Sequence, residues 1–173
     1  MTILLRGSVA VLAAVALAAC ASKNDGATVA TATGDITPTP IAAGYAAGSV
    51  EEFEQSVGHI VRFDYDEATI RNDAAATLER QADWLNTYPS ALLVIGGHAD
   101  ERGTREYNLG LGERRANAVK EFLISRGVST SRLTTISYGK EQPICTLSSE
   151  SCWSQNRRGE SVVELIDGQQ AQR

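Results

Sequence analysis

From residue 50 onward, short apolar stretches alternate with polar turns, as expected of a folded domain. Residues 59–63 alternate and are rich in β-branched and aromatic side chains, whereas residues 91–95 form a continuous apolar run. The first pattern is typical of a half-buried strand, and the second of a central strand buried on both faces. Together with the segments 133–138 and 162–166, these patterns predict four strands.

Two segments between the strands show the spacing of amphipathic helices. Apolar residues recur at intervals of three and four over residues 75–85 and again over residues 109–123. Asn72 or Asp73 can cap the first helix and Thr104 the second, because their side-chain oxygens can accept hydrogen bonds from free N–H groups of the first turn. We therefore expect two long helices, one in each of the first two connections.

The order of these elements predicts the fold class. A weak, helical lead-in covers residues 50–58, and a short helical piece at residues 153–158 precedes the last strand. The main order is β-α-β-α-β-β, which is typical of an α+β domain. In such a domain, two main helices pack on one face of a mixed sheet. The domain is expected over residues 51–168, with a C-terminal tail over residues 169–173.

The N-terminus has the pattern of an export signal. Arg6 precedes an uncharged apolar run over residues 9–19, which is too short to span a bilayer but suits a secretory signal peptide. Residues 17–20, Leu-Ala-Ala-Cys, resemble the bacterial lipobox, so residues 1–19 are expected to be removed and Cys20 to be lipidated. An ordinary signal peptide or a buried apolar helix is the alternative. Ala21, in place of Asp, favours the outer membrane.

Residues 20–50 are expected to form a flexible linker after the lipidated cysteine. The segment is rich in Ala, Thr, Gly and Pro, and it has no helical or strand period. Such a sequence cannot bury enough apolar surface to offset the entropy of ordering it. A disordered linker of this length has a root-mean-square reach of roughly 30 Å, which suits a domain that acts at a distance from its membrane.

Composition excludes some classes of protein and adds one covalent constraint. The 173 residues carry a net charge of −5, which argues against binding nucleic acid through bulk charge. Cys145 and Cys152 lie in one loop of an exported chain, where a disulfide is the default expectation. Closing that loop contributes about 2.5 kcal/mol on the chain-entropy model. A reactive thiol pair or a metal site is the alternative.

Polar residues follow the first two strands and line one side of the second helix. If those strands run parallel, Asp66 and Asp100 leave the sheet at the same edge. Asn108 and Arg115 are seven residues apart and therefore lie on one helix face, with Leu111 between them. A carboxylate and a facing guanidinium can hold the ammonium and carboxylate of an amino acid. The alternative is a purely structural Asp–Arg pair.

Several segments resemble OmpA-like domains, and within them most closely the peptidoglycan-associated lipoproteins. The longest match is residues 97–119, GHADERGTREYNLGLGERRANAV, supported by VRFDYD at 61–66, SYGKEQP at 137–143 and NRR at 156–158. The resemblance implies non-covalent binding of peptidoglycan through the diaminopimelate of its stem peptide. The family's binding residues correspond here to Asp66, Asp100, Asn108, Leu111 and Arg115.

The resemblance also implies a location and partners. It indicates a lipoprotein on the periplasmic face of the outer membrane, acting in the Tol-Pal system with the propeller protein TolB and in membrane constriction during division. It implies neither catalysis nor a cofactor. The alternatives are a wall-anchoring lipoprotein outside Tol-Pal or, from a different class, a peptidoglycan-cleaving enzyme that uses Asp66 and Asp100 as its carboxylate pair.

Some neighbouring residues depart from the family pattern or carry no assigned role. Gly96 and Gly159 replace larger residues that are usual in the family. Arg102 could contact glycan or an acidic partner, whereas Arg114 and the pair at 157–158 are expected to bind loop carboxylates. His98 is expected to pack within its loop and not to ligate a metal, because the chain has only two histidines and no zinc motif.

Overall fold

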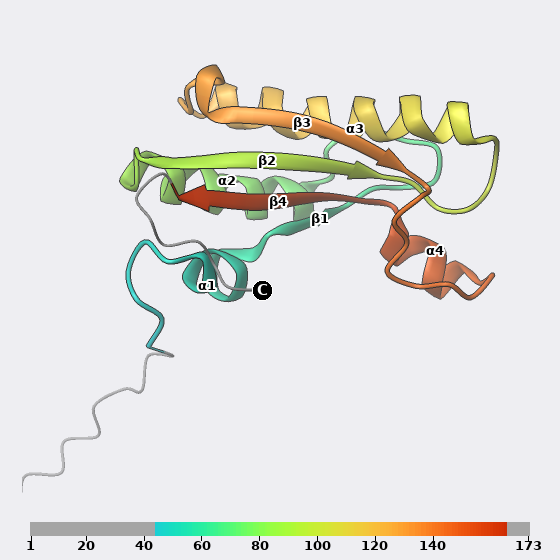
Figure 1. The fold of residues 1–173 in the computed structure, drawn as a ribbon, viewed down its shortest axis with the longest axis horizontal. Helices are drawn as coiled ribbons and strands as arrows, with labels where there is room; N and C mark the ends of the chain where they lie inside the picture. Colours follow the sequence, from blue (N-terminus) through green and yellow to red (C-terminus); the bar gives the residue numbers. More distant parts are fainter. Residues whose placement is uncertain (1–43, 166–173) are drawn as a thin grey trace, which may run out of the picture. The chain divides into compact units, whose positions relative to one another are not determined.

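The computed structural model describes residues 44–165 of the chain, and within them four strands form one mixed sheet (Figure 1). The strands are β1 (Ile60–Arg62), β2 (Ala91–His98), β3 (Leu133–Gly139) and β4 (Arg158–Leu165). The sheet order is β1-β4-β2-β3. β4 is antiparallel to both β1 and β2, and β2 is parallel to β3, so β1 and β2 point the same way.

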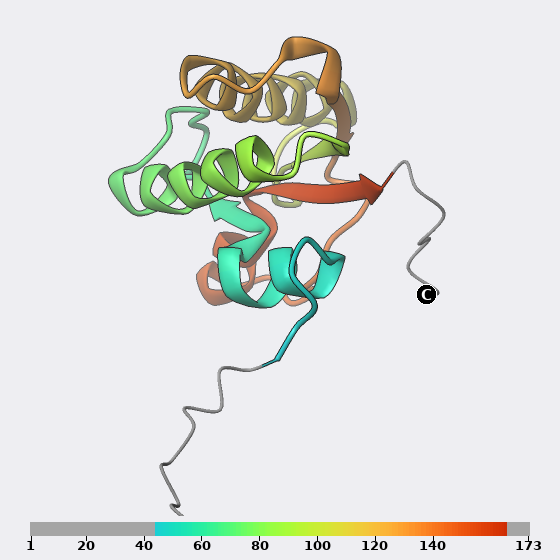
Figure 2. The same cartoon turned by 90° about the vertical axis from the view of Figure 1, so that its left-hand side faces the viewer.

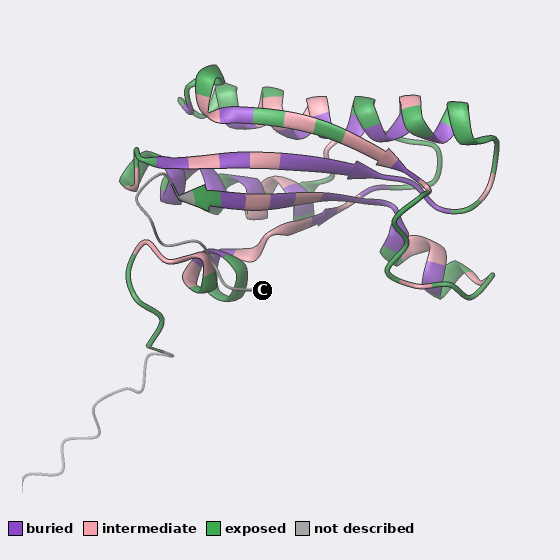
Figure 3. Ribbon diagram, viewed as in Figure 1, coloured by how far each residue is buried: buried purple, intermediate pink, exposed green. Residues whose placement is uncertain are grey.

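The α+β prediction is confirmed, with two long helices packed against the sheet (Figure 2). α2 (Asn72–Thr87) connects β1 to β2, and α3 (Arg105–Ser125) connects β2 to β3. Apolar side chains of both helices and of the inner sheet face form a single core, and they include Val61, Leu78, Leu85, Leu93, Ile95, Val119, Leu123 and Val163. The buried residues concentrate where the helices meet the sheet (Figure 3).

Two strands are longer than the sequence predicts. The apolar run that predicts β2 ends at residue 95, before two glycines, and glycine is a poor strand former. Residues 96–98 instead continue β2, since Gly96 and Gly97 pair with β3 on one side and with β4 on the other. β4 likewise begins at Arg158 and not at residue 162, because its first residues pair with β1. In both places, pairing with neighbouring strands overrides local preference.

The glycines in β2 allow α3 to lie unusually close to the sheet. A Cβ on Gly97 would overlap the carbonyl oxygen of Gly112 in α3, and a Cβ on Gly112 would overlap Ser137 in β3. Only glycine, which has no Cβ, permits this approach of backbone to backbone. The position of α3 over the ends of β2 and β3 therefore depends on a glycine from each element.

The helix starts were predicted with mixed success. The Thr104 hydroxyl accepts a hydrogen bond from the Tyr107 backbone N–H at 3.2 Å, as expected for the cap of α3. The cap of α2 was predicted wrongly. It is Arg71, whose side chain instead forms ion pairs with Asp64 and Asp73. The backbone of Arg71 is extended, and this conformation is what ends the preceding loop.

Shorter helical segments flank the sheet. The lead-in consists of α1 (Val50–Glu52) followed by a π-helical segment, Phe53–Gly58, and a 3₁₀ turn, Thr130–Arg132, precedes β3. The helical piece predicted at 153–158 lies earlier, as α4 (Glu150–Asn156). Among residues 44–165, no helix is both long enough and apolar enough to cross a bilayer.

The predicted disulfide between Cys145 and Cys152 is present, and it ties the start of α4 to the loop that leads into it. The Asn156 side chain reinforces this loop, because its oxygen accepts from the N–H groups of Ile144 and Cys145. The segment from 145 to 157 is thus fixed at both ends. Cys20, the signal peptide at 1–19, most of the linker and residues 166–173 lie outside the described residues.

Candidate ligand-binding site

The loops after β1 and β2 meet beside the N-terminal half of α3 and enclose a hollow of about 200 Å³. They meet because β1 and β2 run in the same direction, so that their carboxyl ends reach the same edge of the sheet. We call this hollow the charged pocket. Its lining is Tyr65, Asp66, Asp100, Arg102, Gly103, Tyr107, Asn108, Leu111 and Arg115.

All five residues predicted to bind a ligand line the charged pocket. Asp66 comes from the loop after β1, Asp100 from the loop after β2, and Asn108, Leu111 and Arg115 from one face of α3. The shared face follows from the three- and four-residue spacing of the helical positions. The convergence is a structural fact, and the role of these residues in binding stays a prediction.

Arg115 is the cation at the base of the pocket, and its guanidinium is fully buried. It donates three hydrogen bonds to backbone carbonyls: Nε to Glu67 at 2.8 Å, Nη1 to His98 at 2.7 Å and Nη2 to Asp64 at 3.0 Å. Burial lowers the pKa of Arg115 to about 10, so the group stays charged at neutral pH. A guanidinium has five N–H groups, which leaves two for a ligand.

Asp100 is the buried carboxylate of the pocket, and two arginines surround it. Arg102 donates to it through Nη2 at 2.6 Å, and Arg157 donates through Nη1 at 3.3 Å. Burial by itself would raise the pKa of Asp100, but hydrogen bonds from the side chain and backbone N–H of Arg102 lower it below the usual value. Asp100 is therefore ionised at neutral pH.

Asp100 does form structural ion pairs, but not with Arg115, the arginine that the sequence suggested. Among the described residues, the ion pairs of Asp100 are with Arg102 and Arg157, and none is with Arg115. Because Asp100 lies in the loop after β2, the prediction that Arg157 binds a loop carboxylate is correct, and Arg157 also pairs with Glu150 of α4 at 2.5 Å. Arg158 instead pairs with Glu160 on its own strand.

The central position of Arg102 does not follow from the sequence. Its guanidinium lies between two aromatic rings, 4.0 Å from the centroid of Tyr65 and 4.1 Å from that of Trp153. Trp153 is on α4, so the disulfide-tied segment supplies one wall of this arrangement. Stacking of arginine between aromatic faces is favourable and directional. The sequence offers one signal for this arrangement, the aromatic Tyr65 next to Asp66. It does not indicate that Trp153 lies against Arg102.

Asp66 and Asn108 are held by contacts from the opposite wall. The Tyr107 hydroxyl donates to the carboxylate of Asp66, which has a left-handed backbone with φ of 58°. The amide of Asn108 donates to the carbonyl of Arg102 at 2.8 Å and thereby fixes the loop that carries Asp100. Tyr107 lies one residue outside the predicted helix stripe, which is why the sequence did not single it out.

His98 is buried at the end of β2 and stacks on Tyr138 with 5.0 Å between ring centroids. The prediction that it packs is correct, although it packs within the sheet and not within a loop. Burial, followed by the charge of Arg158, lowers the pKa of His98 to about 4. Within residues 44–165, no group of His, Cys, Asp and Glu side chains could hold a metal ion.

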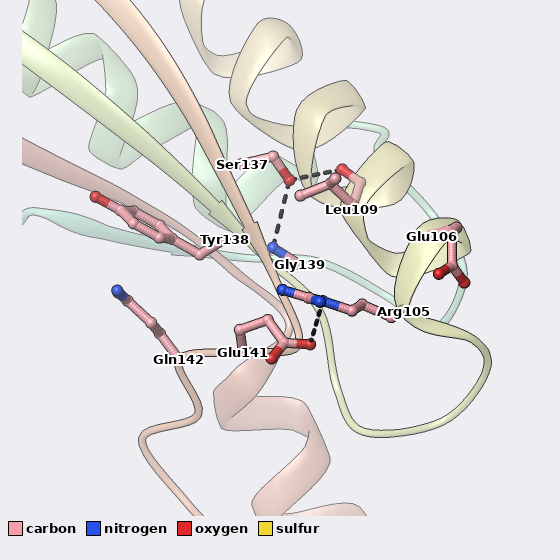
Figure 4. Close-up of a pocket in the computed structure, with 8 residues that line it drawn as sticks. All are labelled: Arg105, Glu106, Leu109, Ser137, Tyr138, Gly139, Glu141 and Gln142. Atoms are coloured by element: carbon pink, nitrogen blue, oxygen red, sulfur yellow. Dashed lines mark hydrogen bonds and ion pairs between the residues drawn. The ribbon is translucent and has the colours of Figure 1, made fainter.

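A second, larger hollow of about 360 Å³ lies between the start of α3 and the end of β3 (Figure 4). Ser137 donates to the carbonyl of Leu109 at 2.6 Å and so joins the two elements. The charged pair at its mouth, Arg105 and Glu141, is separated by 3.3 Å. We call this hollow the open pocket.

Known proteins match the chain over most of its length. The family model described as the OmpA family matches residues 62–157. A peptidoglycan-associated lipoprotein of Rhizobium meliloti is 50% identical over 159 residues, which is 90% of this chain and 85% of that protein. One from Pseudomonas aeruginosa is 41% identical, covering 82% of this chain and 86% of the relative.

Solved structures show the same fold. The crystal structure of the peptidoglycan-associated lipoprotein from Burkholderia pseudomallei is 36% identical and superimposes with a TM-score of 0.64, covering 67% of this chain and all of that one. The C-terminal domain of Helicobacter pylori MotB superimposes with a TM-score of 0.58 at 24% identity, over 62% of this chain and 85% of that one. The second likeness bears on the fold alone.

Proposed function

The chain belongs to the OmpA family and, within it, to the peptidoglycan-associated lipoproteins, and on that premise we propose that it binds peptidoglycan non-covalently. The relatives that match it over most of its length carry this association in their names. The protein then links the outer membrane to the cell wall passively, with a lipid at one end and the folded domain at the other.

The ligand group is the diaminopimelate side chain of the stem peptide, which carries one ammonium and one carboxylate at its free end. The observation that supports this choice is the charged pocket, where an ionised Asp100 and a protonated Arg115 line the same hollow of about 200 Å³. The carboxylate of the ligand takes the two remaining N–H groups of Arg115, and its ammonium binds at the aspartates. Leu111 contacts the methylene chain.

Binding is favoured over hydrolysis by the state of the carboxylates. Glycoside cleavage by two carboxyl groups needs one of them protonated as a general acid, with a raised pKa. The pKa of Asp100 is lowered instead, since two arginines donate to it. The Asp66 carboxylate accepts a hydrogen bond from Tyr107. Asp100 is therefore suited to hold a cationic group and not to serve as the general acid of such a pair.

Attachment to the membrane follows from the sequence at Cys20. Two or more acyl chains give durable anchoring, because each buried methylene contributes roughly 0.8 kcal/mol. The linker over residues 20–50 then lets the domain reach the wall from the periplasmic face of the outer membrane. Labelling with a radioactive fatty acid, compared between the natural chain and Cys20→Ser, tests this step, and equal labelling would reject it.

The family also suggests membership of the Tol-Pal system, with a TolB-like protein as partner and a role in constriction at division. The alternative is a wall anchor outside that system. Copurification with TolB from the same organism, after crosslinking in cells, separates the two. Recovery of peptidoglycan without TolB would favour the alternative.

The test of wall binding is sedimentation of the chain from residue 20 onward, carrying Cys20→Ser, with purified sacculi. Asp100→Asn keeps the shape of the side chain but removes the charge, so we expect sedimentation to fall at least about tenfold, as for the loss of one charged hydrogen bond. Free diaminopimelate should release the natural domain. Sedimentation of Asp100→Asn at the natural level would reject the site.

Arg115→Ala is a poor test, because three buried carbonyls would lose their donor and the loops would rearrange. A matched control is Glu141→Gln, which removes one negative charge from the open pocket, where Glu141 is half exposed. It should sediment like the natural domain. A general loss of binding in both variants would point to overall charge and not to the pocket.

A further inference from the structure

The hydrogen-bonding capacity of Asp100 is fully used by the protein itself. Its Oδ1 accepts from the backbone N–H and from the Nε of Arg102, both at 3.1 Å. Its Oδ2 accepts from Arg102 Nη2 at 2.6 Å and from Arg157 Nη1 at 3.3 Å. A carboxylate offers about four acceptor positions. A ligand ammonium can therefore bind Asp100 only if one of these donors leaves.

Arg157 is poorly placed to leave. Its side chain is only 7% exposed, and it also donates to the carbonyl of Phe63 at 3.2 Å and to Glu150 at 2.5 Å. It follows directly after α4, and its own backbone N–H bonds back to Trp153. Moving this side chain would leave the buried carbonyl of Phe63 without its donor and would take one donor from Asp100, which is costly in a buried site.

Arg102 is the donor that can be exchanged. Its side chain is 29% exposed, and the only described protein groups that its guanidinium pairs with are Asp100 and, at 3.9 Å, the solvent-exposed Glu150. It lines the charged pocket together with Asp100. The rings of Tyr65 and Trp153 hold its guanidinium in place from both sides. The position is thus well defined, yet it opens to solvent.

We propose that Arg102 is an internal counter-ion that occupies the ammonium position of the pocket and is displaced from Asp100 when a ligand ammonium binds. This inference rests on the proposed function, because diaminopimelate is the source of that ammonium. The inference deepens the proposed function by assigning a role to Arg102, whose binding partner the sequence left open. Tyr65 and Trp153 set how readily the exchange occurs, since they stabilise the self-paired state.

The exchange lowers the affinity of the natural domain. When a site is competent in only a fraction of molecules, the apparent dissociation constant rises by the inverse of that fraction. Removing the competing side chain should therefore tighten binding, whereas removing a residue that contacts the ligand would weaken it. The sign of the change separates an internal counter-ion from a direct ligand contact.

The test is calorimetric titration of the chain from residue 20 onward, carrying Cys20→Ser, with diaminopimelate and with a soluble diaminopimelate-containing muropeptide. Arg102→Met keeps the length of the side chain and removes its donors, and Asp100 retains Arg157 and a backbone N–H. We expect both ligands to bind about fivefold more tightly, the upper value for one partly exposed ion pair. Trp153→Leu keeps the charge and should give a smaller gain of about threefold.

The matched control is Arg105→Met, which also removes one positive charge near α3 but lies in the open pocket, 72% exposed and paired with Glu141. Its affinity should stay within about twofold of the natural value. If Arg102→Met binds equally or more weakly while the natural domain binds, the inference is overturned and the proposed function stands. If neither protein binds diaminopimelate, both fail.

A direct readout in the natural domain is the ¹⁵N-edited signal of the Arg102 Nε–H group, assigned by its loss in Arg102→Met. This N–H donates to Asp100 in the structure. At saturation with diaminopimelate, the signal should move to the position of a solvent-exposed arginine and exchange faster with water. A signal that stays in place at saturation would show that Arg102 keeps its contact with Asp100, and the inference would be wrong.

Discussion

The charged pocket and the open pocket lie against two different faces of α3, and the smaller one contains the buried charges. The open pocket encloses about 360 Å³ and the charged pocket about 200 Å³. At the open pocket, the charges of Arg105 and Glu141 are 72% and 50% exposed. In the charged pocket, Asp100 and Arg115 are buried.

The difference shows that the size of a hollow does not indicate how firmly its charges are held. Exposed charges are screened by water and are free to reorient, so an ion pair between them contributes only about 0–1 kcal/mol. Buried charges that are held by fixed hydrogen bonds keep their orientation and act in a lower dielectric. Arg115, with three carbonyl partners, is such a group, and Arg105 is not.

The largest expected effect concerns the glycine contact that holds α3 in place between the two pockets. Gly112→Ala should destabilise the domain by about 3 kcal/mol or more, because the new Cβ overlaps backbone and Ser137 and the helix must move off the sheet. Urea unfolding followed by circular dichroism measures this.

Gly110→Ala is the control in the same helix. A Cβ there would meet only Arg114 Nη1, at an ordinary 3.6 Å. The substitution should stabilise the domain by about 0.5–1 kcal/mol, since alanine has the higher helix propensity. Equal effects of the two substitutions would contradict the close packing of α3 on the sheet.

The next effect compares how much Arg115 of the charged pocket and Arg105 of the open pocket contribute to stability. Arg115→Lys should lower the free energy of unfolding by about 2–3 kcal/mol, because a single ammonium cannot reach three carbonyls in three directions and leaves some unpaired. Arg105→Lys should change it by less than about 0.5 kcal/mol. Similar losses of unfolding free energy for the two variants, measured in the same urea titrations, would mean that the buried arginine contributes no more to stability than the exposed one.

The last effect depends on pH and concerns His98, whose carbonyl accepts from Arg115 and whose ring stacks on Tyr138, a residue of the open pocket. Its folded-state pKa of about 4 lies below the unfolded value of 6.5. The unfolded chain therefore binds a proton first, and stability is lost as the pH falls from 6.5 towards 4. The total loss is up to about 3 kcal/mol, of which roughly half is reached near pH 5.

His98→Phe keeps the stacking and removes the titration, so its unfolding free energy should be flat between pH 6.5 and 5. His59→Gln, at the other histidine, should retain the natural pH dependence. A natural domain equally stable at pH 6.5 and pH 5 would show that His98 is protonated within the fold.

Periodicity and spacing predicted the elements that depend on local sequence. The helix over Arg105–Ser125 and its Thr104 cap follow from a 3.6-residue pattern and one hydroxyl, which need no partner from elsewhere in the chain. The same spacing put Asn108, Leu111 and Arg115 on one face. The parallel direction of the first two strands then brought Asp66 and Asp100 to that face, as expected.

The local sequence did not determine where strands begin and end when glycine or arginine lies at the boundary. β2 continues through Gly96 and Gly97 because neighbours pair on both sides, and those neighbours come from residues 40 and 62 to 64 positions later. Local propensity is a weak preference that such pairing overrides. The same reason accounts for the early start of β4 at Arg158.

What the sequence determined was therefore that Asp66, Asp100 and Arg115 lie around one pocket, since helix spacing and strand direction fix which side chains share an edge. What only the tertiary structure decided was how those charges are paired. Asp100 is bound by Arg102 and Arg157, and Arg102 is stacked on Trp153 from a distant helix. Pairing depends on distances of a few ångströms between segments far apart in the chain, and no periodic pattern encodes such distances.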